Sequence, residues 1–451
     1  MAFAFRRSEA TIQHTMLVMK FGGTSVGTAK TIDTVHTLVR QALPRRPVVV
    51  VSAHSGVTDM LFDLAQRAMR GSTDITHVES RHQEILRDLQ LPLDLHTALF
   101  REMKDLVVGM KLVGEASPRA IDYLVSFGER LSSLTVAAYL TKRGLPARAV
   151  AAFEAGLRTD SSFGRAKPMP DDGRIKRYLA GIKEVPIVTG YIAMDESGNI
   201  TTLGRNGSDY SASLFGNALD AEEIQIWTDV DGVMTADPKL VLNPHPIPTM
   251  SFDEAAELAY YGGKVLHPAT IQPAMEKSIP VRVLNTKRPE SKGTVILPSF
   301  EEPGVAVRSI VHKKGVYLLN LVNARMLQQH GFLAKVFDAA ARHEVVVDLV
   351  ATSEVSISMT TDSSKNLDRF MAELALLGET KVEPRQAMVC VIGHGITTAP
   401  DVAAKVFTTL AEAGVRVRVI SQGAIKVNIA VIVAEEDMQR AVVALHERFF
   451  G

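Results

Sequence analysis

The hydrophobic pattern of the chain alternates between two periods from residue 16 to about residue 296. Short runs rich in Val and Ile, typical of strands buried on both faces, are separated by segments whose apolar residues recur at about 3.6-residue spacing. The runs predict strands over Met16–Lys20, Pro47–Ser52, Val185–Thr189, Ile224–Thr228 and Val281–Leu284. Because strands and helices alternate, the pattern favours a three-layer α/β/α sandwich around a mostly parallel sheet.

Helical periodicity is clearest over Thr58–Ala68 and Glu79–Leu89. A third helix is indicated by its start signal, since Ser251 and Glu254 have the spacing of a capping box ahead of the run AAELAYYGG. The stretch Asn285–Gly304 is richer in Pro, Gly and charge, which favours a linker in this region.

The last 150 or so residues contain an internal repeat. Ala334–Phe337 (AKVF) recurs as Ala404–Phe407, 70 residues later. Four identical residues alone can arise by chance, but both copies have the same predicted order: strand, helix, strand, strand, helix, strand. That order is typical of ferredoxin-like α+β modules, so a duplicated module is predicted. The predicted domains are an N-terminal extension, a catalytic domain, a linker and two modules, at 1–15, 16–296, 297–315, 316–384 and 385–451.

Composition excludes several classes of protein. Lys plus Arg equals Asp plus Glu at 50 each, which argues against broad electrostatic binding to nucleic acid or to an anionic membrane. No apolar run reaches the length of a membrane span, and residues 1–15 lack the apolar core of a secretion signal. The single cysteine, Cys390, allows no internal disulfide, so a reducing, cytoplasmic location is expected.

Several common motifs are absent. Gly263-Lys264 is followed by Val265, so the chain has no P-loop, and Gly393-His394-Gly395 lacks the remaining glycine of a dinucleotide fingerprint. The 13 histidines show no metal-ligand spacing and are interpreted as surface or satisfied structural residues. No protein metal ligand is predicted.

The strongest local signal for chemistry is the segment from Met19 to Val26, MKFGGTSV. A strand ends at Lys20, and Gly22 and Gly23 allow the backbone to approach a ligand closely before a helix begins. A lysine beside such a turn favours phosphate binding. The alternative is a plain strand–turn–helix with an incidental lysine.

A second signal is the segment TTLGRNGSDY, from Thr201 to Tyr210. Arg205 could bind a carboxylate or phosphate through two nitrogens, and Asp209 could pair with a catalytic lysine. An ordinary capped helix with a surface arginine explains the segment equally well.

Three weaker segments follow the same logic. Thr228 and Asp229 lie at the carboxyl end of a predicted strand, where open α/β sheets bind ligands, although a strand followed by an Asp-Gly turn explains them too. Lys264 follows two glycines, which alone are better explained as a helix end. Glu129 is expected near the start of a helix, where a carboxylate often only complements the helix dipole.

Taken together and in order, KFGGTSV, SFGERLS, TTLGRNGSDYSA, WTDVDGV and GGKVLHP closely resemble the aspartate kinase family of the amino-acid kinase superfamily. The resemblance covers nearly the whole chain from about residue 16, and the tail resembles the paired ACT regulatory modules of that family. It implies a three-layer amino-acid kinase sandwich followed by two ACT modules. The chain leaves no room after the second module for a fused homoserine dehydrogenase, so a monofunctional enzyme is expected.

The resemblance implies transfer of a phosphoryl group from ATP, with Mg²⁺, to L-aspartate, giving 4-phospho-L-aspartate, the first step of lysine, threonine and methionine biosynthesis. A substrate carboxylate is already ionised at pH 7, which agrees with a site that offers no histidine base. The implied catalytic residues are Lys20, Asp209 and Lys264. The implied aspartate contacts are Ser52, Thr58, Glu129 for the ammonium, Arg205 for a carboxylate, and Ser208. The implied nucleotide contacts are Lys20, Phe21, Gly22, Gly23, Thr228, Asp229, Met234, Lys239, Lys264 and Val265.

Three residues depart from the family pattern. Asn206 replaces a common glycine, and Asn is the least costly replacement if that position needs a positive φ. Met234 replaces a tyrosine, and Lys239 replaces an arginine and loses its two-pronged hydrogen bonding. These changes are expected to tune ATP affinity.

The first ACT module resembles the lysine-sensitive type, which implies L-lysine as the feedback effector and a homodimer or homotetramer formed through the modules. The implied effector contacts are Met326, Gly331, Phe332, Leu333, Val347, Asp348, Ser353 and Glu354, and Leu327 belongs to the same pattern. Two alternatives stay open. One is a related kinase acting on glutamate, acetylglutamate or a nucleotide, and the other is an amino-acid-binding regulator with an inactive kinase domain.

Overall fold

The computed structural model describes residues 16–262, 268–300, 305–326, 330–397, 399–423 and 427–451. The predicted site residues Lys264 and Val265, and Leu327 of the effector pattern, lie outside the described residues. The chain divides into two compact units. The first runs to Gly232 and resumes over Ala269–Pro298, and the second comprises Val233–Pro268 and Ser299–Gly451.

The first unit is built on a sheet whose strands follow the order β3-β4-β2-β1-β7-β9-β10. Its strands are β1 (Leu17–Phe21), β2 (Pro47–Val51), β3 (Ala147–Val150), β4 (Val185–Thr189), β7 (Glu223–Thr228), β9 (Val281–Asn285) and β10 (Thr294–Leu297). All neighbouring pairs from β3 to β9 are parallel, and only β10 runs antiparallel, against β9. A small hairpin, β5 (Ile192–Met194) with β6 (Ile200–Thr202), stands apart.

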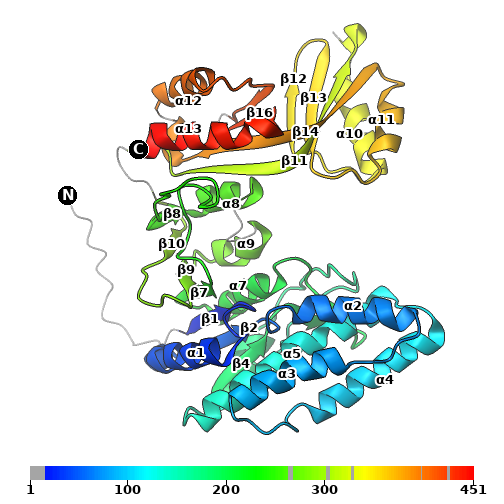
Figure 1. Ribbon diagram of the computed structural model, residues 1–451, viewed down its shortest axis with the longest axis vertical. Coiled ribbons are helices and arrows are strands. Elements are labelled where there is room, and N and C mark those ends of the chain that lie inside the picture. The colour runs from blue at the N-terminus through cyan, green and yellow to red at the C-terminus, as the bar shows by residue number, and fades with distance from the viewer. Residues whose placement is uncertain (1–15, 263–267, 301–304, 327–329, 398, 424–426) are drawn as a thin grey trace. The chain divides into compact units, whose positions relative to one another are not determined.

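Helices cover both faces of this sheet (Figure 1). They are α1 (Ala29–Ala42), α2 (Val57–Met69), α3 (Thr76–Asp88), α4 (Thr97–Val113), α5 (Pro118–Lys142), α6 (Arg174–Ala180), α7 (Gly207–Leu219) and α9 (Pro268–Glu276). Leu17, Met19 and Phe21 pack with α1 and α5 in one core, so the alternate residues Val18 and Lys20 face α7. A second core joins α2, α3, α4 and α5. The three-layer sandwich predicted from the sequence is confirmed.

The predicted strands of this unit agree with the structure to within one residue at each end. The linker interpretation of Asn285–Gly304 is wrong in part, because β10 lies inside it. Thr294 and Ile296 are fully buried, so the Pro, Gly and charged residues before them form the turn of the β9–β10 hairpin.

The second unit contains a six-stranded antiparallel sheet of order β12-β13-β11-β14-β16-β15. The strands are β11 (Ser309–Val322), β12 (Leu349–Thr352), β13 (Ser356–Thr361), β14 (Glu379–Ile392), β15 (Val419–Ser421) and β16 (Asn428–Ala434). The helices are α10 (Phe332–Arg342), α11 (Leu367–Leu374), α12 (Asp401–Glu412) and α13 (Met438–Phe450). The repeated AKVF motif falls in α10 and in α12, which supports the predicted duplication.

Two long strands are shared between the modules. Tyr317–Val322 of β11 pair with β13, and this half of β11 packs into the core with α10 and α11. Ser309–Lys313 of the same strand pair with Met388–Ile392 of β14, and Ile310 packs into the core with α12 and α13. The change falls at register shifts around Val316, next to Gly315, whose φ is 73°.

The predicted linker at 297–315 is therefore wrong over Ser309–Lys313, which form part of a strand. These residues form the strand that completes the second module, although they precede the first module in the chain. The sequence order hid this strand because each module was expected to be contiguous. The first module thus lies inserted within the second.

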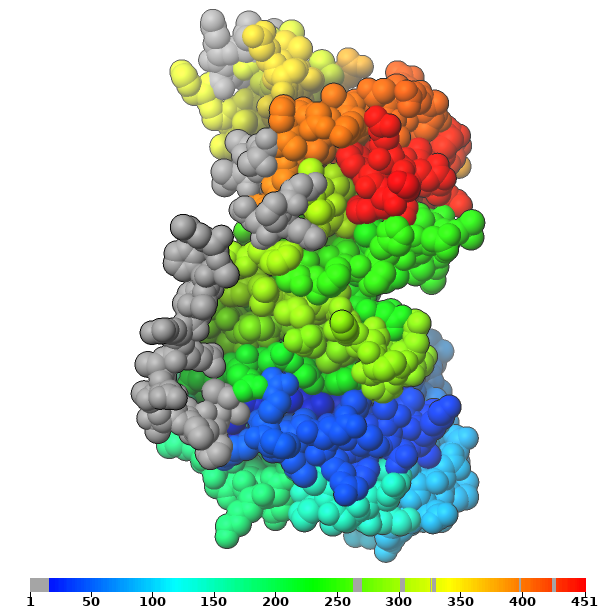
Figure 2. All heavy atoms as spheres, turned by 90° about the vertical axis from the view of Figure 1, so that its left-hand side faces the viewer, coloured from blue at the N-terminus to red at the C-terminus, as the bar shows by residue number. Residues whose placement is uncertain are grey.

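Residues 233–268 form part of the second unit and carry β8 (Thr249–Ser251) and α8 (Phe252–Tyr260). The predicted capping box is confirmed, since Ser251 Oγ accepts from Glu254 N–H at 3.2 Å and Glu254 Oε2 accepts from Ser251 N–H at 2.9 Å. Thr235 Oγ1 lies 2.9 Å from Nε2 of His446 in α13. Helices α12 and α13 lie side by side at the surface of this unit (Figures 1 and 2). Among the described helices, none combines the length and apolar character needed to cross a membrane.

Candidate functional site

The predicted catalytic residues of the first unit gather at the carboxyl edge of the parallel sheet. Phe21 is in register with Val51 of β2 and with Trp227 of β7, so these three strands end at the same level. Ser52 and Thr228 lie at the ends of β2 and β7. Open parallel sheets bind their ligands at this edge, because loops leave the strand ends there.

Lys20 and Asp209 form an ion pair across this edge. The Lys20 ammonium lies 2.6 Å from Asp209 Oδ1, and both side chains are nearly buried. Asp209 occupies the first turn of α7, where a carboxylate also complements the helix dipole. The residue before this helix, Asn206, has φ 55°, so the position does need the left-handed conformation that asparagine tolerates.

Gly22–Val26 form the turn after β1, called the glycine turn below, and backbone hydrogen bonds hold it in place. Gly22 N–H donates to Trp227 O at 3.1 Å, and Ser25 N–H donates back to Gly22 O at 2.9 Å. A Cβ on Gly23 would lie 2.9 Å from Ala53 O, so only glycine fits there. Within the described part of the chain, the N–H groups of Gly23 and Thr24 donate to no other group. Two open donors beside an ammonium make a suitable cradle for phosphate.

Among the carboxyl groups of the site, Glu129 has the pKa that lies furthest from its usual value. It lies in the middle of α5, which corrects the expectation that it sits near a helix start and excludes the helix-dipole explanation. The residue is 3% exposed, Oε1 accepts from Ala53 N–H at 3.1 Å, and Oε2 has no partner among the described residues. Burial raises the pKa of Glu129 to about 8. Such a carboxylate is suited to receive a ligand's ammonium.

The loop between β2 and α2 links these groups. Ala53 N–H donates to Glu129 Oε1, and Ser55 N–H donates to Gly23 O at 3.1 Å. One short loop is therefore hydrogen-bonded both to the glycine turn and to the buried carboxyl group. The sequence reasoning singled out only Ser52 and Thr58, which are half-buried at the two ends of this loop. The missed signal was the loop's place directly after a buried strand.

The remaining predicted substrate residues lie at the start of α7. Ser208 is buried, and a Cβ on Gly190, which follows β4, would lie 2.7 Å from the Ser208 side chain. Arg205 is exposed and forms no ion pair with any described residue. Its guanidinium is therefore available to a ligand.

The predicted nucleotide residues are spread over both units. Thr228 is half-buried at the end of β7 and Asp229 is exposed beside it. Met234 and Lys239 belong to the second unit, where Met234 is half-buried and Lys239 is exposed. Within the described residues, no group of three or more His, Cys, Asp or Glu side chains could hold a metal ion.

The predicted effector residues lie in the first module. Gly331 precedes α10 with φ 77°, Leu333 is exposed, and Phe332 is buried in the module core, so a ligand contact from Phe332 would come from its backbone. The other predicted contacts are the half-buried Met326 and Val347 and the exposed Ser353 and Glu354.

Asp348 already binds an ammonium of its own chain. The Lys313 ammonium lies 3.2 Å from Asp348 Oδ2 and 2.8 Å from Asp362 Oδ2, and the Tyr260 hydroxyl donates to Asp348 Oδ1 at 3.2 Å. Burial raises the pKa of Asp348, although the neighbouring Lys313 favours the ionised form. A ligand ammonium at Asp348 would have to compete with Lys313.

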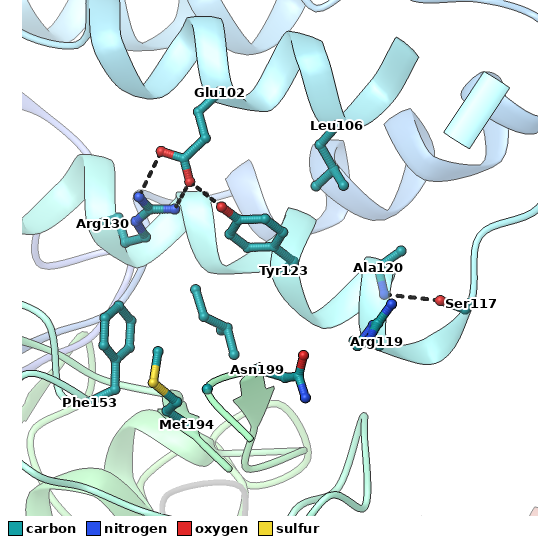
Figure 3. A pocket seen from close by; sticks show the side chains of 12 residues that line it. Glu102, Leu106, Ser117, Arg119, Ala120, Tyr123, Arg130, Phe153, Met194 and Asn199 are labelled. Carbon is teal, nitrogen blue, oxygen red and sulfur yellow. Dashed lines mark hydrogen bonds and ion pairs between the residues drawn. The ribbon is translucent and has the colours of Figure 1, made fainter. Parts of the chain in front are cut away.

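A cavity of about 630 Å³ in the first unit contains none of the predicted site residues (Figure 3). Glu102 on its wall accepts two bonds from Arg130, both at 2.9 Å, and one from the Tyr123 hydroxyl at 2.5 Å. These groups are paired with one another, and the residues that line the cavity include none from the turn after β1.

Comparison with known proteins reveals similarity over nearly the whole chain. Residues 15–285 match the model of the amino acid kinase family, and residues 389–449 match an ACT domain. The chain is 39% identical to chloroplastic aspartokinase 2 of Arabidopsis thaliana, covering 98% of this chain and 86% of that protein. It is 35% identical to lysine-sensitive aspartokinase 3 of Escherichia coli, covering 96% and 99%. The crystal structure of E. coli aspartokinase III with aspartate and ADP matches with a TM-score of 0.80 at 33% identity, covering 97% of this chain and all of that one.

Proposed function

Because this chain belongs to the amino acid kinase family and, within it, to the aspartokinases, we infer that it transfers the γ-phosphoryl group of ATP to the β-carboxylate of L-aspartate. The products are ADP and 4-phospho-L-aspartate. The observation that carries the assignment to this site is the Lys20–Asp209 ion pair beside the open N–H groups of Gly23 and Thr24. The similar E. coli enzyme was crystallised with aspartate and ADP, which supports the substrate pair.

The nucleophile is the substrate's own carboxylate, so the protein does not need to remove a proton. Its task is to align two anions and to neutralise the charge that develops on the transferring group. Lys20 would contact the γ-phosphoryl oxygens, held in place by Asp209, and the two open N–H groups would donate to the same oxygens. Mg²⁺ bound together with the nucleotide would supply further positive charge to the phosphates. Lys264 would add a second ammonium on the phosphates.

Aspartate would be oriented by groups at both ends. Glu129 would accept the α-ammonium at its open Oε2, and Arg205 would bind a carboxylate through two nitrogens. The side chains of Ser52, Thr58 and Ser208 would supply further hydrogen bonds. Thr228, Asp229, Met234, Lys239 and Val265, with Phe21 and Gly22, would complete the nucleotide site.

We further propose feedback inhibition by L-lysine through the first ACT module. The chain is similar to a lysine-sensitive aspartokinase over 96% of its length, and Asp348 already has an ammonium partner in Lys313. An effector lysine that replaced Lys313 would alter this network, and regulation requires different affinity for two states. We also propose assembly into homodimers or homotetramers through the modules and a cytoplasmic location. The proposed domains are a catalytic domain at 16–296, a first module at 316–384, and a second module at 385–451 that Ser309–Lys313 complete.

The test is ADP release by the purified full-length protein with Mg-ATP, measured with L-aspartate, L-glutamate, N-acetylglutamate or a nucleoside monophosphate as acceptor. Turnover with aspartate alone, reduced by lysine and unaffected by threonine, is the expected result. Turnover with another acceptor would replace aspartate as the substrate. Absence of turnover above a Lys20→Ala background, in folded protein, would favour the regulator alternative.

A further inference from the structure

Three buried histidines lie together behind the glycine turn. His54, His82 and His96 are 1%, 0% and 0% exposed, and their ring centroids lie 5.4 Å and 5.6 Å apart in that order. They come from the β2–α2 loop, from α3 and from the residue before α4. The sequence reasoning treated the histidines as scattered, because the three are far apart along the chain.

His54 differs from the other two in what it holds. Its Nδ1 lies 2.6 Å from the carbonyl oxygen of Val26, the last residue of the glycine turn. His82 Nδ1 bonds only Val78 of its own helix, and His96 Nε2 bonds Thr135. Only His54 connects the cluster to the predicted phosphate site.

The hydrogen bond fixes the protonation state of the ring. A carbonyl oxygen can only accept, so His54 Nδ1 carries the proton. Nε2 is buried and has no partner among the described residues, so a second proton there would be an unsatisfied buried donor. Burial also lowers the pKa of His54 well below its usual value, in the same direction as the neighbouring His82. The ring is therefore neutral and held in one tautomer.

Both neighbours of His54 bond catalytic elements. Ala53 N–H donates to Glu129 Oε1, and Ser55 N–H donates to Gly23 O. Val26 itself donates to Gly22 O, so its carbonyl ends a turn whose first amide is fixed by Trp227. The bond to Val26 thus ties the end of the turn that carries the open N–H groups to the loop that bonds Glu129.

We propose that His54 is a positioning residue for phosphoryl transfer, whose neutral imidazole fixes the glycine turn relative to the aspartate-binding carboxyl group. The proposal rests on the function proposed above. His54 does not touch the substrates, and it acts through Val26.

The test compares variants that keep or move the donor. In His54→Asn the amide nitrogen is as many bonds from Cα as Nδ1, whereas in His54→Gln it is one bond further. His54→Leu removes it, and His96→Leu is the matched control, equally buried but without a bond to the turn. Aspartate-dependent kcat, the KM for ATP, the Kd for ADP by calorimetry and Tm are measured for each full-length protein.

We expect kcat to fall about tenfold or more in His54→Leu and His54→Gln, and to recover to within about threefold of wild type in His54→Asn. The KM for ATP should change less than kcat, because the N–H groups of the turn matter most in the transition state. His96→Leu should have a lower Tm than wild type but an unchanged kcat.

The proposal is overturned if His54→Leu keeps wild-type kcat, or if the Asn and Gln variants have equal activity. If His54→Leu does not fold, the Asn–Gln comparison decides alone. A wild-type protein that binds ADP but does not phosphorylate aspartate would refute the proposed function instead. In that case, ADP affinity that is lost in the Gln variant and kept in the Asn variant would still support the role of His54, and equal ADP affinity in the two would contradict it.

Discussion

At the scale of single residues, the Lys20–Asp209 pair gives the sharpest prediction. Lys20→Ala should lower kcat by about 100- to 1000-fold, because the variant loses the charge that neutralises the transition state. Asp209→Asn should lower kcat less, since Lys20 remains but loses the partner 2.6 Å away that orients it. Steady-state ADP release measures both, and Lys30→Ala, an exposed lysine of α1, is the control. Near wild-type turnover in Lys20→Ala would remove Lys20 from the mechanism.

The raised pKa of Glu129 predicts that aspartate binding depends on pH. With a pKa of about 8, the empty site holds Glu129 protonated at pH 7, whereas an ammonium ligand requires the carboxylate. Binding should therefore release a proton, and aspartate affinity should improve about tenfold per pH unit as pH rises towards 8. Calorimetry in two buffers of different ionisation enthalpy measures the proton release. Glu129→Gln should bind aspartate weakly at every pH, and equal pH dependence in this variant would contradict the assignment.

The contact between Asp209 and a lysine could be predicted from the sequence, and the ion pair with Lys20 confirms it, whereas the catalytic roles of both residues stay predictions. Lys20, Gly22, Gly23 and Asp209 stand in two short motifs, and the structure brings the motifs into contact. Prediction from the sequence failed for Glu129, which lies in the middle of α5 and was expected near a helix start. It also failed for His54, which was interpreted only as a surface or satisfied structural residue. The importance of His54 arises from a contact with Val26, 28 residues away, which no local spacing reveals.

At the scale of elements, the buried histidines make the packing of α3 and α4 sensitive to acid. Burial lowers the pKa of His82 to about 4 and that of His96 to about 3. The unfolded chain binds protons below about pH 6.5 that the folded chain excludes, so stability should fall as pH drops from 6.5 towards 4. Each histidine contributes about 1.4 kcal/mol per pH unit in that range. Urea unfolding midpoints at pH 7, 6 and 5 measure the loss.

His96→Leu provides the comparison for this acid sensitivity. In this variant, the free energy of unfolding should fall less steeply with decreasing pH, by about the contribution of one histidine. The carboxyl groups that also titrate are unchanged, so they do not affect the comparison. An unchanged slope would mean that His96 is not excluded from protonation in the fold.

Element prediction from the sequence succeeded for the parallel strands, whose apolar runs are continuous because both faces are buried. It failed over residues 285–304, where β10 is only four residues long and its flanking Pro and Gly residues dominated the interpretation. Strand β11 was missed as a shared strand, because periodicity describes one element at a time and cannot show which of two cores each half enters.

At the scale of the whole molecule, the shared strand β11 makes two positions of one strand report on different modules. Ile310→Ala should destabilise the second module, with α12 and α13, although Ile310 precedes the first module in the chain. Leu319→Ala should instead destabilise the first module, with α10 and α11. Each should cost about 2–5 kcal/mol, since both side chains are fully buried. Hydrogen exchange resolved by segment would show it, and faster exchange in the opposite helices would refute the arrangement.

The insertion of one module within the other also has a consequence for protein engineering. The chain enters and leaves the first module at adjacent places, near Gly315 and near Arg385, which both have positive φ where the paired strands shift register. A foreign sensor of the same topology could be grafted between these two points while the second module keeps its own strands: Ser309–Lys313 of β11, the C-terminal half of β14, β15 and β16. The first module is, in effect, an exchangeable cassette, and its ligand specificity could be replaced without altering the chain on either side.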